Sequence, residues 1–597
     1  MANGNGIRIV DGSLSFEGGI DAGRTPTIAS ESYPNGLKRN QLAFADNVTM
    51  RGGGILTRTG WTPLVQGQAW SGLYQGGFLY NPGTDLPYLM LDIGGRTYQV
   101  RVDTDNSVVD VTAVSGANPA DQPQHWMEQG EEFLVIQDSV SEPLVWDGTS
   151  LQRISAVGNP VAKLPTGTAM SYYMGRMWVA SGGRAFVAGD IVGNPAVTLN
   201  GTAQYGYRDT ILEVTENTFL NGGGIFLVPT MAGNIRALNW PANMDTALGQ
   251  GQLLVFTRKS VYSINVTPDR STWAALSEPL QRVASNQFGT MSDRSIVKVN
   301  GDLFMIGPPN GDVYSFAVAV RNFGSWGNLP ISRNMNRVLR FNDRSLLRYG
   351  TGIEFDNRLL MSALPFETPV GVAHSAIMAL DFDIISSFDE RLPPAWEGIY
   401  EGLDFLQLFS GDFGGRQRAF AVVYSRDNLD IEVWELTTTS RTDGGTLERR
   451  VQWYVETPAY TWGNPFGLKR LDGCELWIDK MFGTVEFELY YKVDQNPCWF
   501  FWHAWKDCAA RSCQEETVEV DCPDSGYPTQ QYCEQFRATV NLPKPPSYCI
   551  PSSKRPSIDG YQFQVKLVVK GWCRVRGVLL YAEPRDKAPY TNMVPNC

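Results

Sequence analysis

The stretch LLVFTR at residues 253–258 is followed almost at once by SVYSIN at residues 260–265. The first segment is a short apolar run that ends in a charged residue, and the second is a short run that contains an aromatic residue. Short runs of this kind, separated by a tight turn, are typical of two paired β-strands. We therefore expect a β-hairpin here.

The same layout recurs through the first part of the chain. Clear copies pair FLVIQD with PLVWDG, LFMIGP with DVYSFA, and FAVVYS with EVWELT, and looser copies lie at residues 87–100, 176–189 and 359–382. The aromatic or apolar landmarks of the second runs lie 40 to 76 residues apart; they are Tyr98, Trp146, Phe186, Tyr262, Tyr314, Leu380 and Trp434.

Several of these spacings fit a propeller blade, which takes roughly 40 to 50 residues. We therefore expect an all-β fold, with an irregular β-propeller of about seven blades over residues 71–446. An array of β-sandwiches is the alternative that the unequal spacing leaves open. Residues 1–70 are expected to supply strands that close or clamp the propeller.

Residues 447–597 indicate a separate domain. In VEFELYY (485–491) and YQFQVKLVV (561–569) apolar and polar residues alternate, as in strands with one buried and one wet face. All nine cysteines lie between Cys474 and Cys597. We expect a C-terminal β-sandwich-like domain with a long cysteine-rich insertion around residues 498–549, which lacks any strand or helix period.

The candidate chemistry is sparse. No two cysteines stand in a C-x2-C pair, and the histidine nearest them is His503, so we expect no metal site and mostly reduced, packed cysteines. His125 and His374 lie beside or within apolar segments and are interpreted as packing residues. No nucleotide-binding or hydrolase motif occurs, so we expect neither a cofactor nor an enzyme.

The charge is uneven along the chain. The formal net charge is −12, residues 447–597 carry 18 acidic and 18 basic residues, and the excess acid therefore lies in residues 1–446. This balance disfavours tight binding of nucleic acid, although it suits a surface along which DNA slides without sticking. The sequence has no signal-peptide pattern and no apolar run of the roughly 20 residues that a membrane-spanning helix needs.

The segment NQLAFADNVTMRGGGILTRTGW at residues 40–61 combines three glycines with two arginines. Gly52–Gly54 permit a tight reversal, so the flanking segments are expected to pair as strands. Arg51 and Arg58 offer planar donors to carboxylates or carbonyl groups, and with Trp61 they form our candidate clamp on a neighbouring blade or subunit. The alternative is a propeller-closing hairpin with two surface arginines.

Two stretches carry a resemblance to a known family. The first resembles a segment near the N-terminus of bacteriophage tail tubular or nozzle proteins, where an A-x-N strand, a glycine turn and an R-x-G strand recur; its residues are Ala45, Asp46, Asn47, Val48, Gly53, Gly54, Leu56, Arg58, Gly60 and Trp61. The second, at residues 453–505, looks like the C-terminal β-domain of similar virion proteins through Lys469, Glu475, Tyr490, Tyr491, Asp494 and Trp499.

The resemblance implies a structural virion protein at the end of a short tail, assembled in the host cytoplasm. It implies a homo-oligomeric ring of about six copies that contacts adaptor or hub proteins and tail fibres or a needle. Genomic DNA would pass through its acidic lumen without specific binding. On this interpretation Arg58→Ala weakens assembly rather than folding, and deletion of residues 509–532 spares the propeller.

Two other functions stay open. A glycan-binding propeller would use exposed aromatic residues, for which clusters such as CWFFWHAW (498–505) are candidates. A polysaccharide-degrading enzyme would need a carboxylate pair, such as Asp383 with Asp389 or Asp404 with Asp412.

Overall fold

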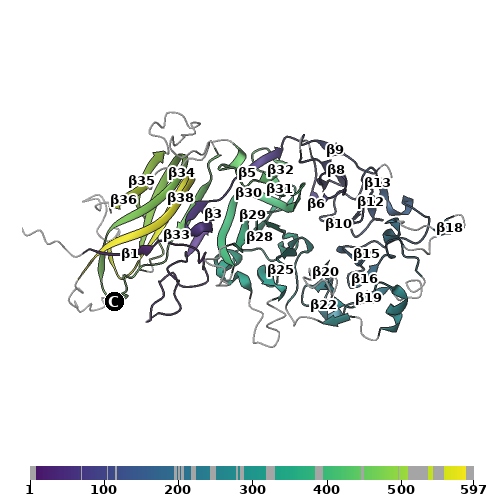
Figure 1. The fold of residues 1–597 in the computed structure, drawn as a ribbon, viewed down its shortest axis with the longest axis horizontal. Coiled ribbons are helices and arrows are strands. Elements are labelled where there is room, and N and C mark those ends of the chain that lie inside the picture. The colour runs from purple at the N-terminus through teal and green to yellow at the C-terminus, as the bar shows by residue number, and fades with distance from the viewer. Residues whose placement is uncertain are drawn as a thin grey trace, which may run out of the picture.

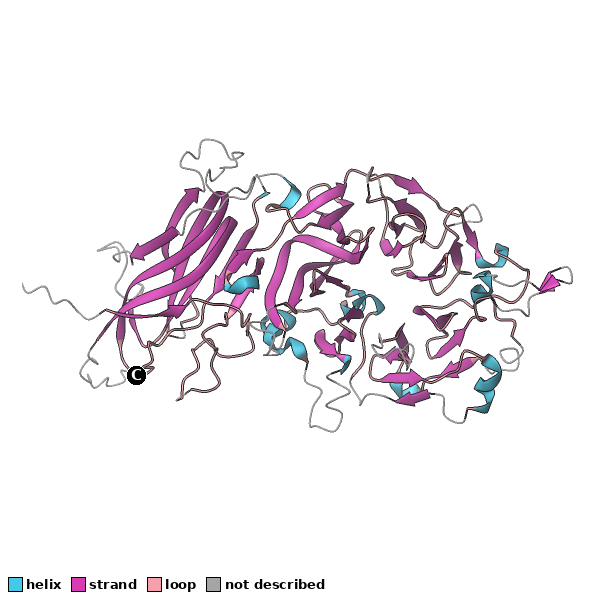
Figure 2. Ribbon diagram, viewed as in Figure 1, coloured by secondary structure: helices cyan, strands magenta, loops and turns pink. Residues whose placement is uncertain are grey.

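The computed structural model describes residues 8–585 with internal gaps. Those gaps are residues 32, 69, 104, 114–116, 194–197, 200–201, 204–207, 217–223, 242–250, 277–279, 283–287, 318–329, 384–393, 446–448, 495, 509–535 and 542–556. The described chain is built from antiparallel strands, and its helices are short pieces in the connections (Figure 2). The fold is all-β, as the sequence predicts.

Five small antiparallel sheets follow one another between residues 74 and 315 and lie around a ring (Figure 1). Four have four strands and the fifth has three. In chain order their strands are β6 (Tyr74–Tyr80), β7 (Tyr88–Ile93), β8 (Arg96–Val100) and β9 (Val108–Asp110); β10 (Trp126–Gly130), β11 (Phe133–Gln137), β12 (Leu144–Trp146) and β13 (Leu151–Arg153); β14 (Met170–Tyr173), β15 (Arg176–Ser181), β16 (Ala185–Ala188) and β19 (Ile225–Leu227); β20 (Ile235–Asn239), β21 (Leu253–Thr257), β22 (Val261–Ile264) and β23 (Leu280–Arg282); and β24 (Val297–Val299), β25 (Asp302–Gly307) and β26 (Asp312–Ser315). They are the blades of a five-bladed β-propeller.

The uniformly apolar runs of the sequence follow from how these blades stack. Successive residues of a strand point to opposite faces, so a blade between two neighbours buries both faces. In β11, Leu134 and Ile136 pack against the first blade, whereas Phe133 and Val135 pack against the third. A middle strand buried in this way has no polar face, and its sequence therefore does not alternate.

A larger sheet completes the ring. Its strands β27 (Gly352–Phe355), β28 (Arg358–Thr368), β29 (Gly371–Asp381), β30 (Ala395–Asp412), β31 (Gln417–Ser425) and β32 (Asp430–Leu436) pair in succession, and β5 (Trp61–Val65) adds to β32. Strands β24 and β27 are in contact, as are β30 and β6. Residues of β31 and β32 share one apolar cluster with β7, which packs the large sheet against the first blade.

The expected count of seven blades is not confirmed, since the described chain has five small sheets of this kind. The landmarks Tyr98, Trp146, Phe186, Tyr262 and Tyr314 each lie on the third strand of one blade. Leu380 and Trp434, the last two landmarks, lie instead on β29 and β32 of the large sheet. These strands resemble blade strands in sequence because they too are buried on both faces.

The C-terminal strands extend the same hydrogen-bonded sheet away from the propeller (Figure 1). They are β33 (Gln452–Glu456), β34 (Lys469–Val493), β35 (Phe500–Cys508), β36 (Phe536–Asn541), β37 (Asp559–Gly560) and β38 (Phe563–Pro584). Strands β34 and β38 pair along nearly their whole lengths, with register shifts in the middle. These pairings form one continuous sheet, so the predicted sandwich of two sheets is not confirmed.

Strands from the N-terminal segment are inserted between these elements. Strand β1 (Ile9–Ser13) pairs with β38, while β2 (Phe44–Asp46) pairs with β33 and makes one parallel bridge to β30. Strands β3 (Val48–Thr49) and β4 (Ile55–Thr57) pair with each other, and β4 also pairs with β38. One apolar core runs from the fifth blade through β28–β30 and the N-terminal strands into the C-terminal sheet.

The remaining elements are short. A two-stranded ribbon is formed by β17 (Thr198–Leu199) and β18 (Thr202–Ala203). The helical pieces are η1 (Arg51–Gly53), η2 (Ile154–Ala156), η3 (Arg208–Leu212), η4 (Thr230–Ala232), η5 (Arg270–Ala275), η6 (Asp293–Ser295), η7 (Ile331–Met335), α3 (Asn336–Leu339), η8 (Leu347–Tyr349) and η9 (Asp443–Gly445). Within the described ranges, none of the helices has the length and apolar character that crossing a membrane requires.

Most of the cysteine-rich insertion, including the proposed deletion at residues 509–532, lies outside the described residues. Of the cysteines that the structure describes, Cys474 and Cys573 are buried free thiols and Cys498 is an exposed one. Burial raises the pKa of the Cys474 and Cys573 thiols above their ordinary value, so both remain protonated at neutral pH.

Candidate functional site: the arginine cluster

The turn between β3 and β4 sets the position of the first candidate arginine. Gly52 and Gly53 adopt φ values of 74° and 76°, a region that glycine enters without a steric penalty. Beyond the turn, Val48 pairs with Thr57 and Thr49 pairs with Leu56. The tight reversal with flanking paired strands, which the three glycines predict, is confirmed.

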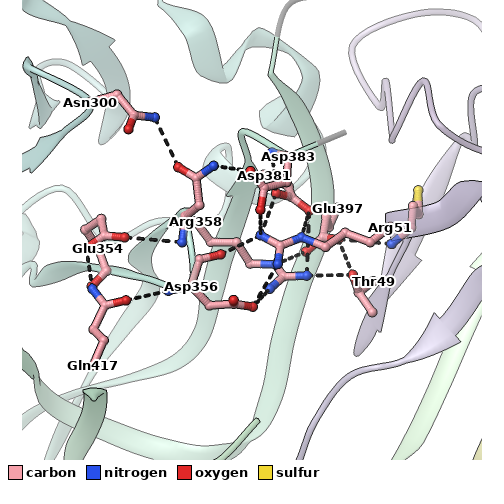
Figure 3. A network of polar contacts seen from close by, with 12 residues as sticks. Thr49, Arg51, Asn300, Glu354, Asp356, Arg358, Asp381, Asp383, Glu397 and Gln417 are labelled. Carbon is pink, nitrogen blue, oxygen red and sulfur yellow. Dashed lines mark hydrogen bonds and ion pairs between the residues drawn. The ribbon is translucent and has the colours of Figure 1, made fainter. Parts of the chain in front are cut away.

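Arg51 reaches from this turn to the ends of two strands of the large sheet (Figure 3). Its guanidinium donates two parallel hydrogen bonds to Asp381 at the end of β29, from Nε to Oδ2 at 2.7 Å and from Nη2 to Oδ1 at 2.9 Å. Nη1 donates to Oδ2 of Asp356 at 2.8 Å, and Asp383 lies 3.3 Å from Nη2. Bidentate pairing of this kind fixes the geometry of both side chains.

A second guanidinium, that of Arg358 at the start of β28, completes the cluster. Its Nε donates to Oε2 of Glu397 at 2.8 Å, and its Nη2 donates to the hydroxyl of Thr49 at 2.8 Å. Thr49 in turn donates to Glu397, which also accepts from the Met50 amide at 3.0 Å and from the Tyr400 hydroxyl at 2.9 Å. We call Thr49, Arg51, Asp356, Arg358, Asp381, Asp383 and Glu397 the arginine cluster.

The electrostatics of the cluster favour charged partners held together. Two guanidiniums face four carboxylates, and the Glu397 side chain is fully buried. Burial acts to raise the pKa of Glu397, but ion pairing with Arg358 and hydrogen bonds from Thr49 and Met50 outweigh it, so the pKa lies below its ordinary value. Burial raises the pKa of Asp381, against the opposing effect of the hydrogen bond from Arg51.

Arg58 lies at a separate position and is only 2% exposed. Its Nε donates to Oδ1 of Asn47 at 2.6 Å, and its two terminal nitrogens donate to the Asp443 carboxylate at 3.0 Å each. It also donates to the backbone carbonyl of Glu401 on β30 at 2.8 Å. These hydrogen bonds tie the segment before β5 to Asn47, β30 and η9.

Trp61 shares a partner with Arg58. Its backbone amide donates to Oδ1 of Asp443 at 3.0 Å, and its fully buried ring packs 5.3 Å from that of Phe405. The structure therefore brings Arg58 and Trp61 together at Asp443. Arg51 belongs to the arginine cluster instead.

The sequence interpretation did not identify Arg358, Glu397 or Asp443. Arg51 is 330 residues from Asp381 and 305 residues from Asp356, so no local spacing links it to these partners. One partial signal is Asp383, which belongs to a candidate carboxylate pair in the sequence. The paired residue then suggested, Asp389, lies outside the described residues.

Each of the three histidines contacts a neighbouring group of the fold. Nδ1 of His125 lies 2.7 Å from the Asp92 carboxylate, and His374 is buried with Nδ1 3.2 Å from the Phe405 carbonyl oxygen. The His503 ring stacks on Trp505. In the part of the chain that the structure describes, no group of three metal-binding side chains is close enough to hold an ion.

No protein-family model matches the chain, and no curated protein matches it significantly. Among solved structures, the chain is similar to the β-propeller domain of Myceliophteria_thermophila Cps50 (Swd1), with 11% identity over 63% of this chain and 100% of that one and a TM-score of 0.35. It is also similar to BBS1N, solved in complex with ARL6DN, with 12% identity, 64% and 99% coverage and a TM-score of 0.33. YCF48 bound to D1 peptide gives 11% identity, 63% and 98% coverage and a TM-score of 0.31.

Proposed function

We propose that this chain is a structural virion protein, a nozzle or tail-tube component that forms a ring through which phage DNA is retained and ejected. The observation that carries the proposal is the place of residues 45–61. These residues bear the family resemblance. They pair with β30, β33 and β38, and Arg51 and Arg58 hydrogen-bond to Asp381 and to the Glu401 carbonyl of the large sheet.

A subunit in the wall of a ring has to hold its propeller and its C-terminal sheet in a fixed relative orientation. The segment supports this in two ways. Strands β2 and β4 hydrogen-bond to the C-terminal sheet, and ion pairs hold the same segment to Asp381 at the end of β29 and to Asp443 of η9. Charged groups with several fixed hydrogen-bond partners resist rearrangement, because each alternative position leaves a buried charge unpaired.

The charge distribution supports the part of the proposal that concerns the passage of DNA. The acidic excess lies in residues 1–446, which include the propeller. A ring of such subunits would carry a strong negative field, and repulsion from the DNA phosphates would keep the DNA mobile.

Electron microscopy of the purified protein and of intact particles tests the proposal, after the mass in solution has been measured. We expect a closed ring whose density matches the end of the tail. A protein that remains a monomer and is absent from the tail would contradict the proposal.

The glycan-binding alternative requires exposed aromatic side chains at repeated blade positions. The exposed aromatic residues of the described chain are Phe341, Phe466, Phe501 and Tyr561, and all four lie outside the five blades. We therefore propose no second function.

A further inference from the structure

A cavity of about 440 Å³ opens beside Arg58 on the large sheet. Residues of β29, β30, β31 and β32 line it. Among the residues that line it are Glu401, Asp404, Tyr424, Arg426, Glu432 and Arg449. Its volume lies within the range of small-ligand pockets and is large enough for one long side chain.

The innermost charged group of the cavity is Glu432, which is only 2% exposed. Its carboxylate accepts hydrogen bonds from Asn428 Nδ2 at 2.7 Å, Trp434 Nε1 at 2.8 Å and Gln66 Nε2 at 3.3 Å. All three donors are uncharged, and in the described chain no cation forms an ion pair with Glu432. Burying a carboxylate without a cationic partner costs free energy, because no opposite charge replaces the hydration that the carboxylate loses.

A second carboxylate in the wall is in a similar state. Glu401 is partly buried, and burial raises the pKa of its carboxyl group. Its backbone carbonyl and amide are bonded to Arg58 and Asn47, yet its side-chain carboxyl has no ion pair within the described ranges. Glu401 and Glu432 therefore present uncompensated negative charge to one cavity.

The two arginines of the cavity do not remove this charge. Arg426 forms an ion pair with Asp404, to which it donates two hydrogen bonds. Arg449 is exposed, with its guanidinium carbon 6.0 Å from the centre of the Trp434 ring. With Asp427 included, four carboxylates line the cavity against two guanidiniums.

We propose that this cavity binds a guanidinium or primary ammonium group, which enters between Glu401 and Glu432. The group is either an arginine or lysine side chain of a second copy of this chain or a free alkylamine. The planar side chains of Tyr424 and Trp434 line the same cavity and offer apolar surface to the alkyl part of such a ligand. The inference does not depend on the virion role.

Butylguanidinium and butylurea are matched probes, because they have nearly the same shape and differ in charge. Isothermal titration of the full-length protein, at a concentration where it is monomeric, is expected to show saturable binding of butylguanidinium and none of butylurea. No saturable binding of butylguanidinium, or equal binding of the two probes, would overturn the proposal.

Two variants locate the binding. Glu432→Gln and Glu401→Gln are each expected to weaken butylguanidinium at least about tenfold, since each removes a charged acceptor. Asp412→Asn is the control, because Asp412 is an exposed carboxylate of β30 that lines a different cavity. If Asp412→Asn weakens binding as much as Glu401→Gln does, the assignment of the site is wrong. Glu401→Gln keeps the test valid should Glu432→Gln fail to fold.

The mass in solution distinguishes the two sources of the cation. If a second copy supplies it, wild-type protein forms an oligomer at high concentration, and excess butylguanidinium or Glu401→Gln dissociates it. If a free alkylamine is the ligand, the mass is unchanged by either treatment while butylguanidinium still binds. A ring that persists in Glu401→Gln leaves the virion proposal intact and excludes the second copy as the ligand of this cavity.

Discussion

Asp46 is a buried carboxyl group near the joint between the large sheet and the C-terminal sheet. It lies on β2 and is 6% exposed, and its Oδ1 has no hydrogen-bond partner among the described residues. Burial, with repulsion from Glu401, raises the pKa of Asp46 to about 8, against the attraction of Arg58 and Lys566. Asp46 is thus mostly protonated at neutral pH.

This raised pKa predicts a stability that falls with alkali. Neutral Asp46 contributes fully below the unfolded pKa of about 4, and that contribution is lost as the pH rises through 8. Asp46→Asn cannot ionise, so its stability relative to the wild type should increase between pH 5 and pH 9. Urea unfolding at both pH values measures this, with exposed Asp121→Asn as the control. Parallel pH profiles for Asp46→Asn and the wild type would contradict the prediction.

His374 predicts the opposite sensitivity. Burial lowers the pKa of His374 to about 4, so its contribution to stability is present above about 6.5 and is lost as the pH falls from there towards 4. His374→Gln should cost stability at pH 7, where the hydrogen bond to Phe405 is weakened, and should lose less stability than the wild type on acidification. Urea unfolding at pH 7 and pH 4.5 provides the measurement. His503→Gln, which changes a more exposed histidine, should leave the acid response unchanged.

At the scale of elements, two glycines near the β3–β4 turn have different tasks. A Cβ on Gly60 would lie 1.9 Å from the Thr442 carbonyl oxygen, whereas a Cβ on Gly52 would meet nothing within 4 Å. Gly52 needs glycine only for its positive φ. Glycine is therefore needed at position 60 because two backbones approach closely there, and at position 52 only because of the backbone conformation.

Gly52→Ala and Gly60→Ala should separate these effects. The strain of the left-handed conformation should cost Gly52→Ala about 1–2 kcal/mol, and Gly60→Ala should cost more because the backbone of η9 has to move. Thermal or urea unfolding of the two variants measures the difference. Equal losses of stability in the two variants would show that the backbone at Thr442 can move away from residue 60 at little cost in free energy.

The arginine cluster gives a second test at this scale. Arg51→Ala leaves buried Asp381 with only the more distant Arg358, and should lower the free energy of unfolding by about 2–4 kcal/mol. Arg51→Lys keeps the charge but loses the two-pronged pairing, so its loss should be smaller. Arg96→Ala, which breaks an exposed ion pair with Asp110, should cost at most about 0.5 kcal/mol. A loss for Arg51→Ala no greater than that control would contradict a structural role.

The sequence predicts these elements better than it predicts their arrangement. Trp146 and Trp434 lie in similar apolar runs because both are on strands packed on two faces, and such a run does not reveal whether its strand belongs to a blade or to the large sheet. The difference lies in partners: β32 pairs with β5, whose residues are more than 360 positions away. The glycine turn could be predicted because its cause is local.

For the whole molecule, Arg58→Ala distinguishes a clamp within the subunit from one between subunits. Removing this buried guanidinium takes away a donor of the Glu401 carbonyl and leaves Asp443 with the Trp61 amide but no ion-pair partner in the described chain. We therefore expect a lower unfolding temperature and an unchanged oligomer mass below it. Differential scanning fluorimetry and analytical ultracentrifugation measure the two effects. An unchanged unfolding temperature with a smaller oligomer would instead support our original expectation of a contact between subunits.

The pairing of β1 with β38 has a consequence for biosynthesis. Residues 9–13 leave the ribosome more than 560 residues before their partners at residues 578–582. The blades can close one after another from nearby segments during translation, whereas β1 must wait with an unpaired edge until β38 has been made. A chain that terminates before β38 therefore retains its propeller strands but leaves the edge of β1 without this partner, which favours aggregation or degradation.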